Sequence, residues 1–374
     1  MKSDNNTSRS HIFMVVVLFV GTALNFLFFV GTCNDDKNLV GEVMYLDDDK
    51  KSVDDVVRLD GDTLAFKNDM CAHITNNDPD MVCVPLAGMP ATTFAVTYDP
   101  KTEWIAKSRD SQGNMNYVLD LATIVKNNVP HNQLVLDVGC NVGLFSMSAL
   151  GLGHRVVAFE PGLENRKRIE AATFVNGFTS RMTLVPYALG ADLGHFQLFL
   201  NPDSKVYKSD GIVVSGPDDP MFNTLNKNIH ANSGATGDRW TLEHILVVSL
   251  DLYNNRNQLK DVYAVKIDVE GFESLFVTGA KKFFTDVHPK ILMMELNGLL
   301  WHSRAGMPGY MDIPDTLRFF EKVGYEIYDQ PCIYQGKSNC PVRTALYFEK
   351  LIEVEKSKKN VELRWDIVLK YNET

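Results

Sequence analysis

The stretch LVLDVGCNVGLFSMSALGLGHRVVAFEP, residues 134–161, carries the strongest structural signal in the chain. It opens with a short apolar run typical of a buried strand, which ends in an acid and a glycine-rich turn. An apolar run of helical length follows, and a second strand-like run ends at Glu160. This order predicts a βαβ unit that holds a nucleotide-like ligand at its first turn.

The turn DVGCNVG, residues 137–143, favours a ligand without phosphates. Gly139 and Gly143 permit a tight turn and a close approach of the backbone, and the helix that begins beside Gly143 offers N–H groups. A dinucleotide fingerprint has the spacing G-x-G-x-x-G, whereas Asn141 stands in the middle here and would crowd a diphosphate. S-adenosylmethionine suits this turn, with its amino acid end bonded to these N–H groups and to Asp137.

Glu160 is the candidate for binding the ribose of that ligand. It ends the second strand about 20 residues after the turn, where an acid can accept hydrogen bonds from two ribose hydroxyls. NAD also contains such a ribose, so Glu160 alone does not choose the ligand. An ordinary tight turn followed by a surface acid is the alternative interpretation.

Strands and helices continue to alternate and predict an α/β fold, with a parallel sheet covered by helices on both faces. The expected strands are residues 134–138, 155–160, 182–187, 262–268 and 290–295, and the expected helices are 116–126, 143–151, 163–175, 272–284 and 312–323. Residues 324–329 and 344–349 are expected to form an antiparallel pair at the edge of the sheet. The loop-rich residues 190–245 are expected to be disordered or to form a lid.

A second group of acids lies in VKIDVEGFE, residues 265–273. Asp268 closes a strand whose carboxyl end faces the ligand crevice, and Glu270 stands in the turn that follows. We expect Glu273 to stabilise the next helix rather than to act in catalysis. Lys266 lies inside the strand and either pairs with an acid or contacts the substrate. Glu295 ends the next strand and is a third candidate acid.

The motifs DVGCNVGLFS, AFEP, VSLDLY, VKIDVEGFE, VTGA and MMEL occur in this order, and together they resemble the FkbM-type S-adenosylmethionine-dependent methyltransferases. The resemblance covers residues 134–295 and extends less clearly to 349. It implies a class I methyltransferase, with a Rossmann-like parallel sheet and a terminal antiparallel strand. It also implies O-methyl transfer, often to sugars or natural-product hydroxyls. Cys140 departs from the Ala that is common in the family, but it is small enough to leave room for the cofactor.

The implied reaction needs a base that accepts the proton of the acceptor hydroxyl. Asp268 and Glu270 are the candidates, followed by Glu295, and His302 is a further alternative. A divalent metal held by these oxygens would lower the pKa of the acceptor. The sequence does not require such a metal, and it contains no CxxC or HxxxH spacing typical of a zinc site.

Residues 12–30 carry no charge, and about 19 apolar residues are enough to cross a bilayer as a helix. Lys2 and Arg9 precede this run, whereas Asp35 and Asp36 follow it, which favours a cytoplasmic N-terminus. A cleaved signal peptide is the alternative, although its apolar core would be shorter. We therefore expect a single-pass type II membrane protein of the Golgi or endoplasmic reticulum with a lumenal catalytic domain.

The expected organisation has five parts: a short cytoplasmic tail (1–10), a transmembrane signal-anchor (11–33), an acidic stem with an N-terminal extension (34–95), a methyltransferase domain (96–350) and a C-terminal extension (351–374). Residues 35–80 contain 13 Asp and Glu but 5 Lys and Arg, which is typical of a solvated, partly flexible stem. The net charge of −10 argues against a nucleic-acid partner.

The six cysteines fit a lumenal location. Cys71 with Cys83, and Cys332 with Cys340, could each close a short loop, whereas Cys33 and Cys140 are expected to be free thiols. The alternative is that all six are reduced.

These observations favour a membrane-anchored O-methyltransferase acting on a hydroxylated acceptor, for which a glycan or sugar is the leading candidate. A lumenal glycosyltransferase is one alternative, but no D-x-D motif stands at a suitable strand end. A non-catalytic protein with the methyltransferase fold is the other, and the acids at positions 137, 160 and 268 argue against it.

Overall fold

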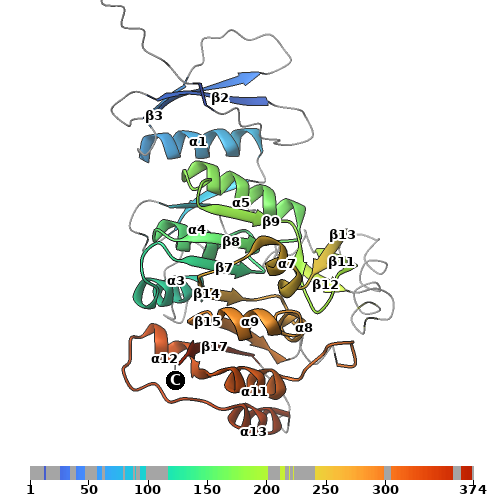
Figure 1. The fold of residues 1–374 in the computed structure, drawn as a ribbon. Helices are drawn as coiled ribbons and strands as arrows, with labels where there is room; N and C mark the ends of the chain where they lie inside the picture. The colour runs from blue at the N-terminus through green and yellow to red at the C-terminus, as the bar shows by residue number, and fades with distance from the viewer. Residues whose placement is uncertain are drawn as a thin grey trace, which may run out of the picture.

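Figure 1 shows a computed structural model of the protein. The structure describes residues 12–13, 26–33, 39–46, 57–60, 64–78, 81–86, 89, 93–97, 117–200, 211–214, 219, 222, 241–298, 305–356 and 364–372.

A central sheet with the order β16-β17-β15-β14-β7-β8-β9 organises the molecule. All of its strands run parallel except β17, which pairs antiparallel with β15 and β16. The strand order reverses between β7 and β14, and ligands bind in open α/β sheets at such a point, beyond the carboxyl ends of the strands. The strands are β7 (Leu134–Val138), β8 (Arg155–Phe159), β9 (Met182–Val185), β14 (Val262–Ile267), β15 (Ile291–Asn297), β16 (Tyr325–Asp329) and β17 (Arg364–Tyr371).

Each face of this sheet has its own apolar core. Alternate residues of β7 point to opposite faces, with Leu136 in one core and Val135 in the other. Burial on both faces explains why the strand is a continuous apolar run. One face is covered by α3 (Tyr117–Asn128), α4 (Leu144–Gly151), α5 (Leu163–Val175) and α12 (Gln330–Tyr334), and the other by α7 (Leu250–Asn257), α8 (Glu273–Thr278), α9 (Lys281–Val287), α11 (Ile313–Val323) and α13 (Ala345–Lys356).

The C-terminal part corrects two expectations. Residues 344–349 are not a strand but the start of α13, because Ala345, Phe348 and Ile352 recur at helical spacing and are buried together. The antiparallel strand is instead β17, which lies in the segment expected to be a C-terminal extension. The central sheet therefore continues past residue 350, and β16 confirms the strand expected at 324–329.

Part of the segment 190–245, expected to be disordered or to form a lid, belongs to a second sheet. Its order is β10-β13-β11-β12, with β10 (Ala188–Leu189), β11 (Gly194–Leu200), β12 (Gly211–Val214) and β13 (Thr241–Val248). Apolar residues of this sheet pack against Phe272 and Leu275, and strands β11, β12 and β13 lie beside the central sheet (Figure 1). Residues 201–210 and 223–240 of the segment lie outside the described residues.

The single helix expected at 272–284 is two helices, α8 and α9. They meet near Gly279, where the backbone of Gly190 approaches so closely that a Cβ on Gly279 would lie 1.9 Å from the Gly190 oxygen. The Gly279 oxygen in turn accepts a hydrogen bond from the Asp251 N–H at 2.9 Å. The break is therefore the point where the second sheet and α7 join the central domain.

Part of the expected flexible stem is folded. Helix α1 (Leu64–Asn77) and the hairpin of β5 (Val82–Pro85) and β6 (Phe94–Thr97) pack beside α5, and a disulfide joins Cys71 to Cys83. Asn176, directly after α5, fixes the hairpin because its side chain accepts from the Phe94 N–H at 2.9 Å and donates to the Phe94 oxygen at 2.7 Å.

The region predicted to cross the membrane is not helical where the structure describes it. Strand β1 (Ile12–Phe13) and most of strand β2 (Phe26–Cys33) fall within it or at its border, and residues 14–25 lie outside the described part. β2 belongs to an antiparallel sheet with β3 (Leu39–Leu46) and β4 (Val57–Asp60). Aromatic and β-branched residues, frequent in β2, favour strands. No helix in the described ranges is both long and apolar enough to span a bilayer.

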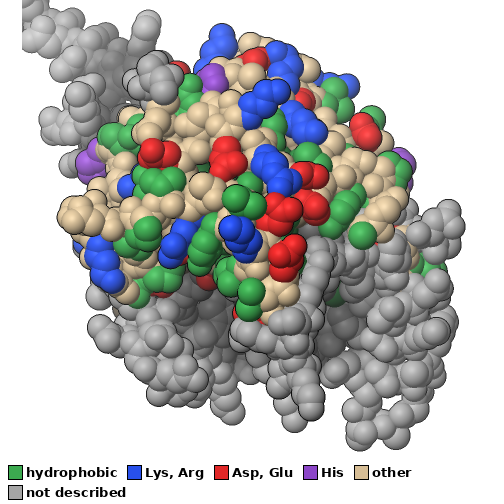
Figure 2. Space-filling view, turned by 90° about the horizontal axis from the view of Figure 1, so that it is seen from below, with side chains coloured by type: hydrophobic (Ala, Val, Ile, Leu, Met, Phe, Trp, Pro, Cys, Tyr) green, Lys and Arg blue, Asp and Glu red, His purple; other side chains and the backbone are tan. Residues whose placement is uncertain are grey.

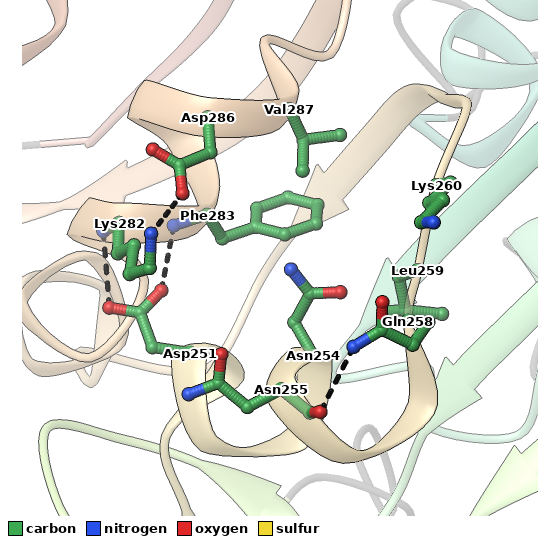
Figure 3. Close-up of a pocket in the computed structure, with 10 residues that line it drawn as sticks. All are labelled: Asp251, Asn254, Asn255, Gln258, Leu259, Lys260, Lys282, Phe283, Asp286 and Val287. Atoms are coloured by element: carbon green, nitrogen blue, oxygen red, sulfur yellow. Dashed lines mark hydrogen bonds and ion pairs between the residues drawn. The ribbon is translucent and has the colours of Figure 1, made fainter.

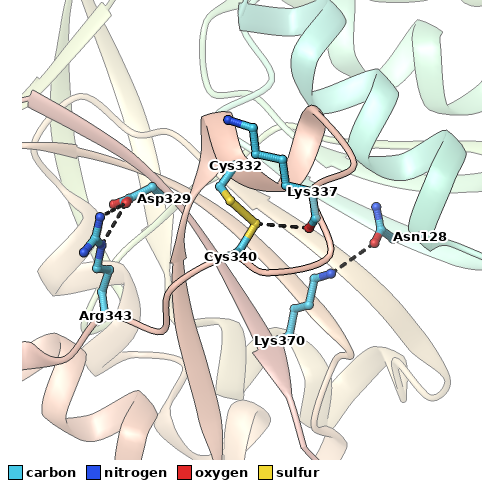
Figure 4. The surroundings of a disulfide bond; sticks show 7 residues. All are labelled: Asn128, Asp329, Cys332, Lys337, Cys340, Arg343 and Lys370. Atoms are coloured by element: carbon cyan, nitrogen blue, oxygen red, sulfur yellow. Dashed lines mark hydrogen bonds and ion pairs between the residues drawn. A yellow bond between two sulfur atoms is a disulfide. The ribbon is translucent and has the colours of Figure 1, made fainter.

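The second disulfide joins Cys332 to Cys340 beside the edge of the central sheet (Figure 4). Two polar pairs flank it: Arg343 with Asp329, and Lys370 with Asn128. Both predicted disulfides are thus confirmed. Cys140 is confirmed as a buried free thiol, while the side chain of Cys33 lies outside the described part.

The surface near α11 and α13 is mixed in character. Viewed from below, Lys and Arg side chains lie next to Asp and Glu, with apolar side chains between them (Figure 2). The exposed apolar residues include Leu346 and Val354 of α13, separated along the helix by Lys350. No single sign of charge dominates the described part of this face.

Candidate active site

The glycine-rich turn after β7 is tied to the end of β8 by its own N–H groups. The N–H groups of Gly139 and Cys140 both donate to the Phe159 oxygen, at 3.2 and 3.1 Å. The Asn141 N–H donates to Glu160 Oε2 at 2.9 Å, and the Val142 N–H donates to the Asn141 side chain at 2.7 Å. These four N–H groups hold the turn against the end of β8, and the N–H groups expected to bind the amino acid end of a ligand are those at the start of α4, after Gly143.

Gly139 is required where the turn meets the loop after β14. Its φ is +76°, and a Cβ there would lie 1.9 Å from the backbone oxygen of Asp268. Asn141 and Gly143 also have positive φ, of 54° and 80°, which Asn and Gly adopt more readily than other residues. The glycine pattern thus reflects backbone packing within the site.

Glu160 is buried at the end of β8, directly beside the turn. Besides Asn141, its carboxylate accepts from the Gly162 N–H at 2.9 Å and from Asn165 Nδ2 at 3.2 Å. Burial raises its pKa to about 7, and the hydrogen bonds it accepts oppose that rise. Glu160, the acid predicted to bind a ribose, therefore lies directly beside the glycine-rich turn, and its role in ligand binding stays a prediction.

Lys266, in β14, contacts the glycine-rich turn after β7 and two acids, Asp137 of β7 and Asp268, which follows β14. Its Nζ donates to the Gly139 oxygen at 2.6 Å and lies 3.3 Å from Asp268 Oδ2 and 3.6 Å from Asp137 Oδ1. Burial lowers the pKa of Lys266, but the charges of Asp268 and Asp137 outweigh burial and the net shift is upward. Of the two roles expected for Lys266, pairing with acids is the one that the structure shows.

Asp137 is fully buried at the centre of this group. Ser146 Oγ of α4 donates to its Oδ2 at 2.6 Å, while Oδ1 has no hydrogen bond and faces Lys266. Burial raises the pKa of Asp137, and the charge of Lys266 and the Ser146 hydrogen bond oppose this. Sequence reasoning did not identify Ser146, because an isolated Ser in an apolar helix carries no motif.

Three candidate acids lie at or beyond the carboxyl edge of the sheet. Asp268 follows Ile267, which pairs with Met294, so Asp268 and Glu295 are neighbours on adjacent strands. Asp268 keeps 21% of its side chain exposed, whereas Glu295 is buried. Glu270 is partly exposed in the turn, with a positive φ of 50°.

Glu273 lies in the first turn of α8, as expected, and its carboxylate also binds the preceding loop. The N-cap of α8 is Phe272, and it makes no side-chain capping bond. Glu273 is fully buried, and its Oε1 accepts the N–H groups of Val269 at 3.2 Å and Gly271 at 3.1 Å. Its carboxylate therefore binds the loop that carries Asp268 and Glu270.

The described residues contain no group of three His, Cys, Asp or Glu side chains that could hold a metal ion. His302, the alternative base, lies outside them.

A separate polar pocket of about 250 Å³ lies between α7 and α9 (Figure 3). Asp251 stands at its edge and accepts the N–H groups of Lys282 at 3.1 Å and Phe283 at 2.7 Å, at the start of α9. None of the predicted site residues lines this pocket.

The order of the central sheet, the turn after β7 and the acid after β8 together define a Rossmann-like methyltransferase fold. The description of the family whose model matches residues 137–327, half of the chain, is Methyltransferase FkbM domain. The chain belongs to this family and is an S-adenosylmethionine-dependent methyltransferase.

Comparison with curated proteins finds no match. Similar solved structures include the precorrin-6y C5,15-methyltransferase of Geobacter metallireducens, at 10% identity and a TM-score of 0.31, covering 71% of this chain and 92% of that chain. TYW2 of P. horikoshii in complex with MeSAdo has 12% identity and a TM-score of 0.31, with 78% and 70% covered. A TehB-like methyltransferase of Corynebacterium glutamicum has 12% identity and a TM-score of 0.30, with 70% and 91% covered.

Proposed function

We propose that the protein transfers a methyl group to a hydroxyl of a carbohydrate acceptor, with Asp268 as the base. The observation that carries this proposal is the position of Asp268. It is a partly exposed carboxylate at the carboxyl edge of the sheet, and Lys266 links it to the glycine-rich turn, whereas the partly exposed Glu270 lies farther out in the loop. A carboxylate at such an edge can accept the proton of a hydroxyl that approaches from solvent.

The residues around the crevice fit S-adenosylmethionine. Asp137 presents a buried oxygen without a hydrogen bond, and Glu160 presents acceptor oxygens at the strand end. Asp137, the turn at 139–143 and Glu160 would hold this cofactor, which supplies an electrophilic methyl group when bound. Because Asn141 replaces the central glycine, a diphosphate ligand is disfavoured.

The remaining residues of the site orient the acceptor side. Lys266 holds Asp268 at the edge, and Glu295 lies beside it on the next strand. Carboxylates are good acceptors for the several hydroxyls of a sugar. Holding the hydroxyl in line for transfer provides much of the acceleration in a reaction of this kind.

We further propose a membrane-anchored protein whose catalytic domain faces the lumen. Two disulfides support an oxidising compartment, and the uncharged run at 12–30, preceded by Lys2 and Arg9, supports a type II anchor. Such a domain would need its cofactor delivered across the membrane. Protease protection of residues 64–372 in sealed vesicles supports this topology, and digestion without detergent contradicts it.

The central test is binding and turnover by the full chain in detergent. We expect S-adenosylmethionine to bind the wild type, and Asp137→Asn to weaken binding, in titration calorimetry. Asp268→Asn should leave binding intact and abolish methylation of a sugar panel followed by mass spectrometry. Absence of cofactor binding by the wild type would sink the proposal. Transfer to amines but not hydroxyls would overturn the acceptor class.

A further inference from the structure

The loop between β14 and α8, residues 268–272, has an uncommon backbone. Glu270 and Gly271 are consecutive residues with positive φ, of 50° and 87°. Gly adopts this region freely, but Glu does so at a conformational cost. Glu270 stands two residues after Asp268, the candidate base. A loop that contains such a residue needs surrounding contacts to hold its backbone conformation.

Glu273 provides these contacts from inside the protein. Its Oε1 accepts the N–H groups of Val269 and Gly271, the two neighbours of Glu270. Its Oε2 is buried and has no hydrogen-bond partner. Phe272 and Leu275, close to Glu273 in the sequence, are buried as well and pack against the second sheet.

The same loop also contacts the end of β7 and the glycine-rich turn that follows it. The Asp268 N–H donates to the Val138 oxygen at 3.1 Å, and the Asp268 oxygen fills the space where a side chain on Gly139 would stand. A shift of the loop would therefore move the candidate base relative to the crevice.

We propose that Glu273 is a positioning residue that holds the β14–α8 loop in the conformation needed for methyl transfer. It accepts N–H groups on both sides of Glu270 and so fixes Asp268 at the sheet edge. This inference depends on the proposed function, because it concerns the base of that reaction.

The protonation state of Glu273 should then control the loop. Burial raises its pKa to about 7. The backbone N–H groups of Glu273 itself, Gly271 and Val269 oppose this rise, whereas the charge of Asp268 adds to it. Asp268 is the charged group that acts on Glu273, and Lys266 lies behind it, 3.3 Å from Asp268 Oδ2. A protonated carboxyl is a weaker acceptor, so the loop loosens as the pH falls through about 7.

The test compares Glu273→Gln and Glu273→Ala in the full chain. Gln keeps one acceptor oxygen and the side-chain shape, and it mimics the protonated acid. As a matched control, Glu353→Gln removes the charge of an exposed Glu on α13. We expect kcat to fall roughly 10- to 100-fold in Glu273→Ala and less in Glu273→Gln, because a small misplacement of a catalytic group has effects of this size. The affinity for S-adenosylmethionine should stay near that of the wild type.

The pH profile and amide exchange separate positioning from general support of the fold. The wild type and the control should lose kcat as the pH falls from 8 to 6, whereas Glu273→Gln should have a low and flat profile. Hydrogen exchange at Val269 and Gly271 should be faster in both Glu273 variants than in the control. If Glu273→Gln keeps the wild-type profile and exchange rates, the positioning role is wrong. If exchange changes as expected but the wild type transfers no methyl group, the proposed function fails and the loop contact stands.

Discussion

Lys266 is the residue on which the charge balance of the site depends. It is buried between Asp137, which is fully buried, and the partly exposed Asp268. Removing one partner of a buried ion pair leaves the other charge uncompensated, at a cost of about 3–5 kcal/mol. We therefore expect Lys266→Met to lower the free energy of unfolding by roughly that amount in urea titrations.

A double mutant checks the cause. Adding Asp137→Asn to Lys266→Met removes the orphaned charge and should recover part of the lost free energy of unfolding. Strict additivity of the two single changes would show that the pair does not interact.

Gly139 offers a second test at the scale of one residue, with Gly177 as its matched control. Both have positive φ, of +76° and +68°, but a Cβ on Gly177 would meet no atom within 4 Å. Gly177→Ala should therefore destabilise by about 1–2 kcal/mol through the backbone alone. Gly139→Ala should lose a further 1–3 kcal/mol or so, because its Cβ meets the Asp268 oxygen, and should also weaken cofactor binding. Equal losses in urea titration would contradict the close contact.

The residues of the site were only partly predictable from the sequence. The turn at 137–143 and Glu160 could be placed because both follow a strand in a local motif. The bond from Lys266 to Gly139 could not, since it joins residues 127 positions apart. Glu273 could be placed at a helix start, but only the folded loop shows which N–H groups its side chain accepts.

At the scale of elements, short apolar runs caused the errors. Residues 134–138 could be identified as a strand because burial on both faces makes the whole run apolar. Residues 344–349 fit a strand equally well, and it is the later buried Ile352 that establishes the helical period of α13. β17 was missed because it lies beyond the residues that resemble the family. Its pairing with β15 also joins segments that are far apart in the sequence, which a local pattern does not predict.

The attachment of the β5–β6 hairpin to α5 can be tested through Asn176. Its side chain bonds both backbone groups of Phe94, so Asn176→Ala leaves a buried donor and acceptor without these partners. The expected loss is about 2–4 kcal/mol. We expect faster limited proteolysis between residues 64 and 97, while the central domain, from residue 117 onward, stays resistant. Unchanged cleavage there would show that the hairpin is held by other contacts, such as the apolar contact of Phe94 with Val175.

At the scale of the whole molecule, two buried carboxyls link stability to pH. Burial raises the pKa of both Glu160 and Glu273 to about 7, from 4.5. An acid whose folded pKa is raised contributes stability that is fully present below its unfolded pKa and is lost as the pH rises through the folded value. The folded protein should thus gain stability as the pH falls from about 7.5 to 5.5, by at most about 3 kcal/mol for each group. His154 and His73 oppose this below pH 6.5, because burial lowers the pKa of both, whereas Asp120, whose pKa burial raises to about 6, acts in the same direction as the two Glu residues.

Thermal unfolding of the full chain between pH 5.5 and 7.5 measures this dependence. Glu273→Gln should make the curve shallower, because one of the two titrating groups is gone, and the exposed control Glu353→Gln should leave its slope unchanged. Saturating S-adenosylmethionine should raise the melting temperature at every pH, since it binds the folded state. A melting temperature that rises with pH in the wild type, and a slope that Glu273→Gln leaves unchanged, would contradict stabilisation of the fold by protonation of Glu273, and the argument for a pH-controlled loop would lose its basis.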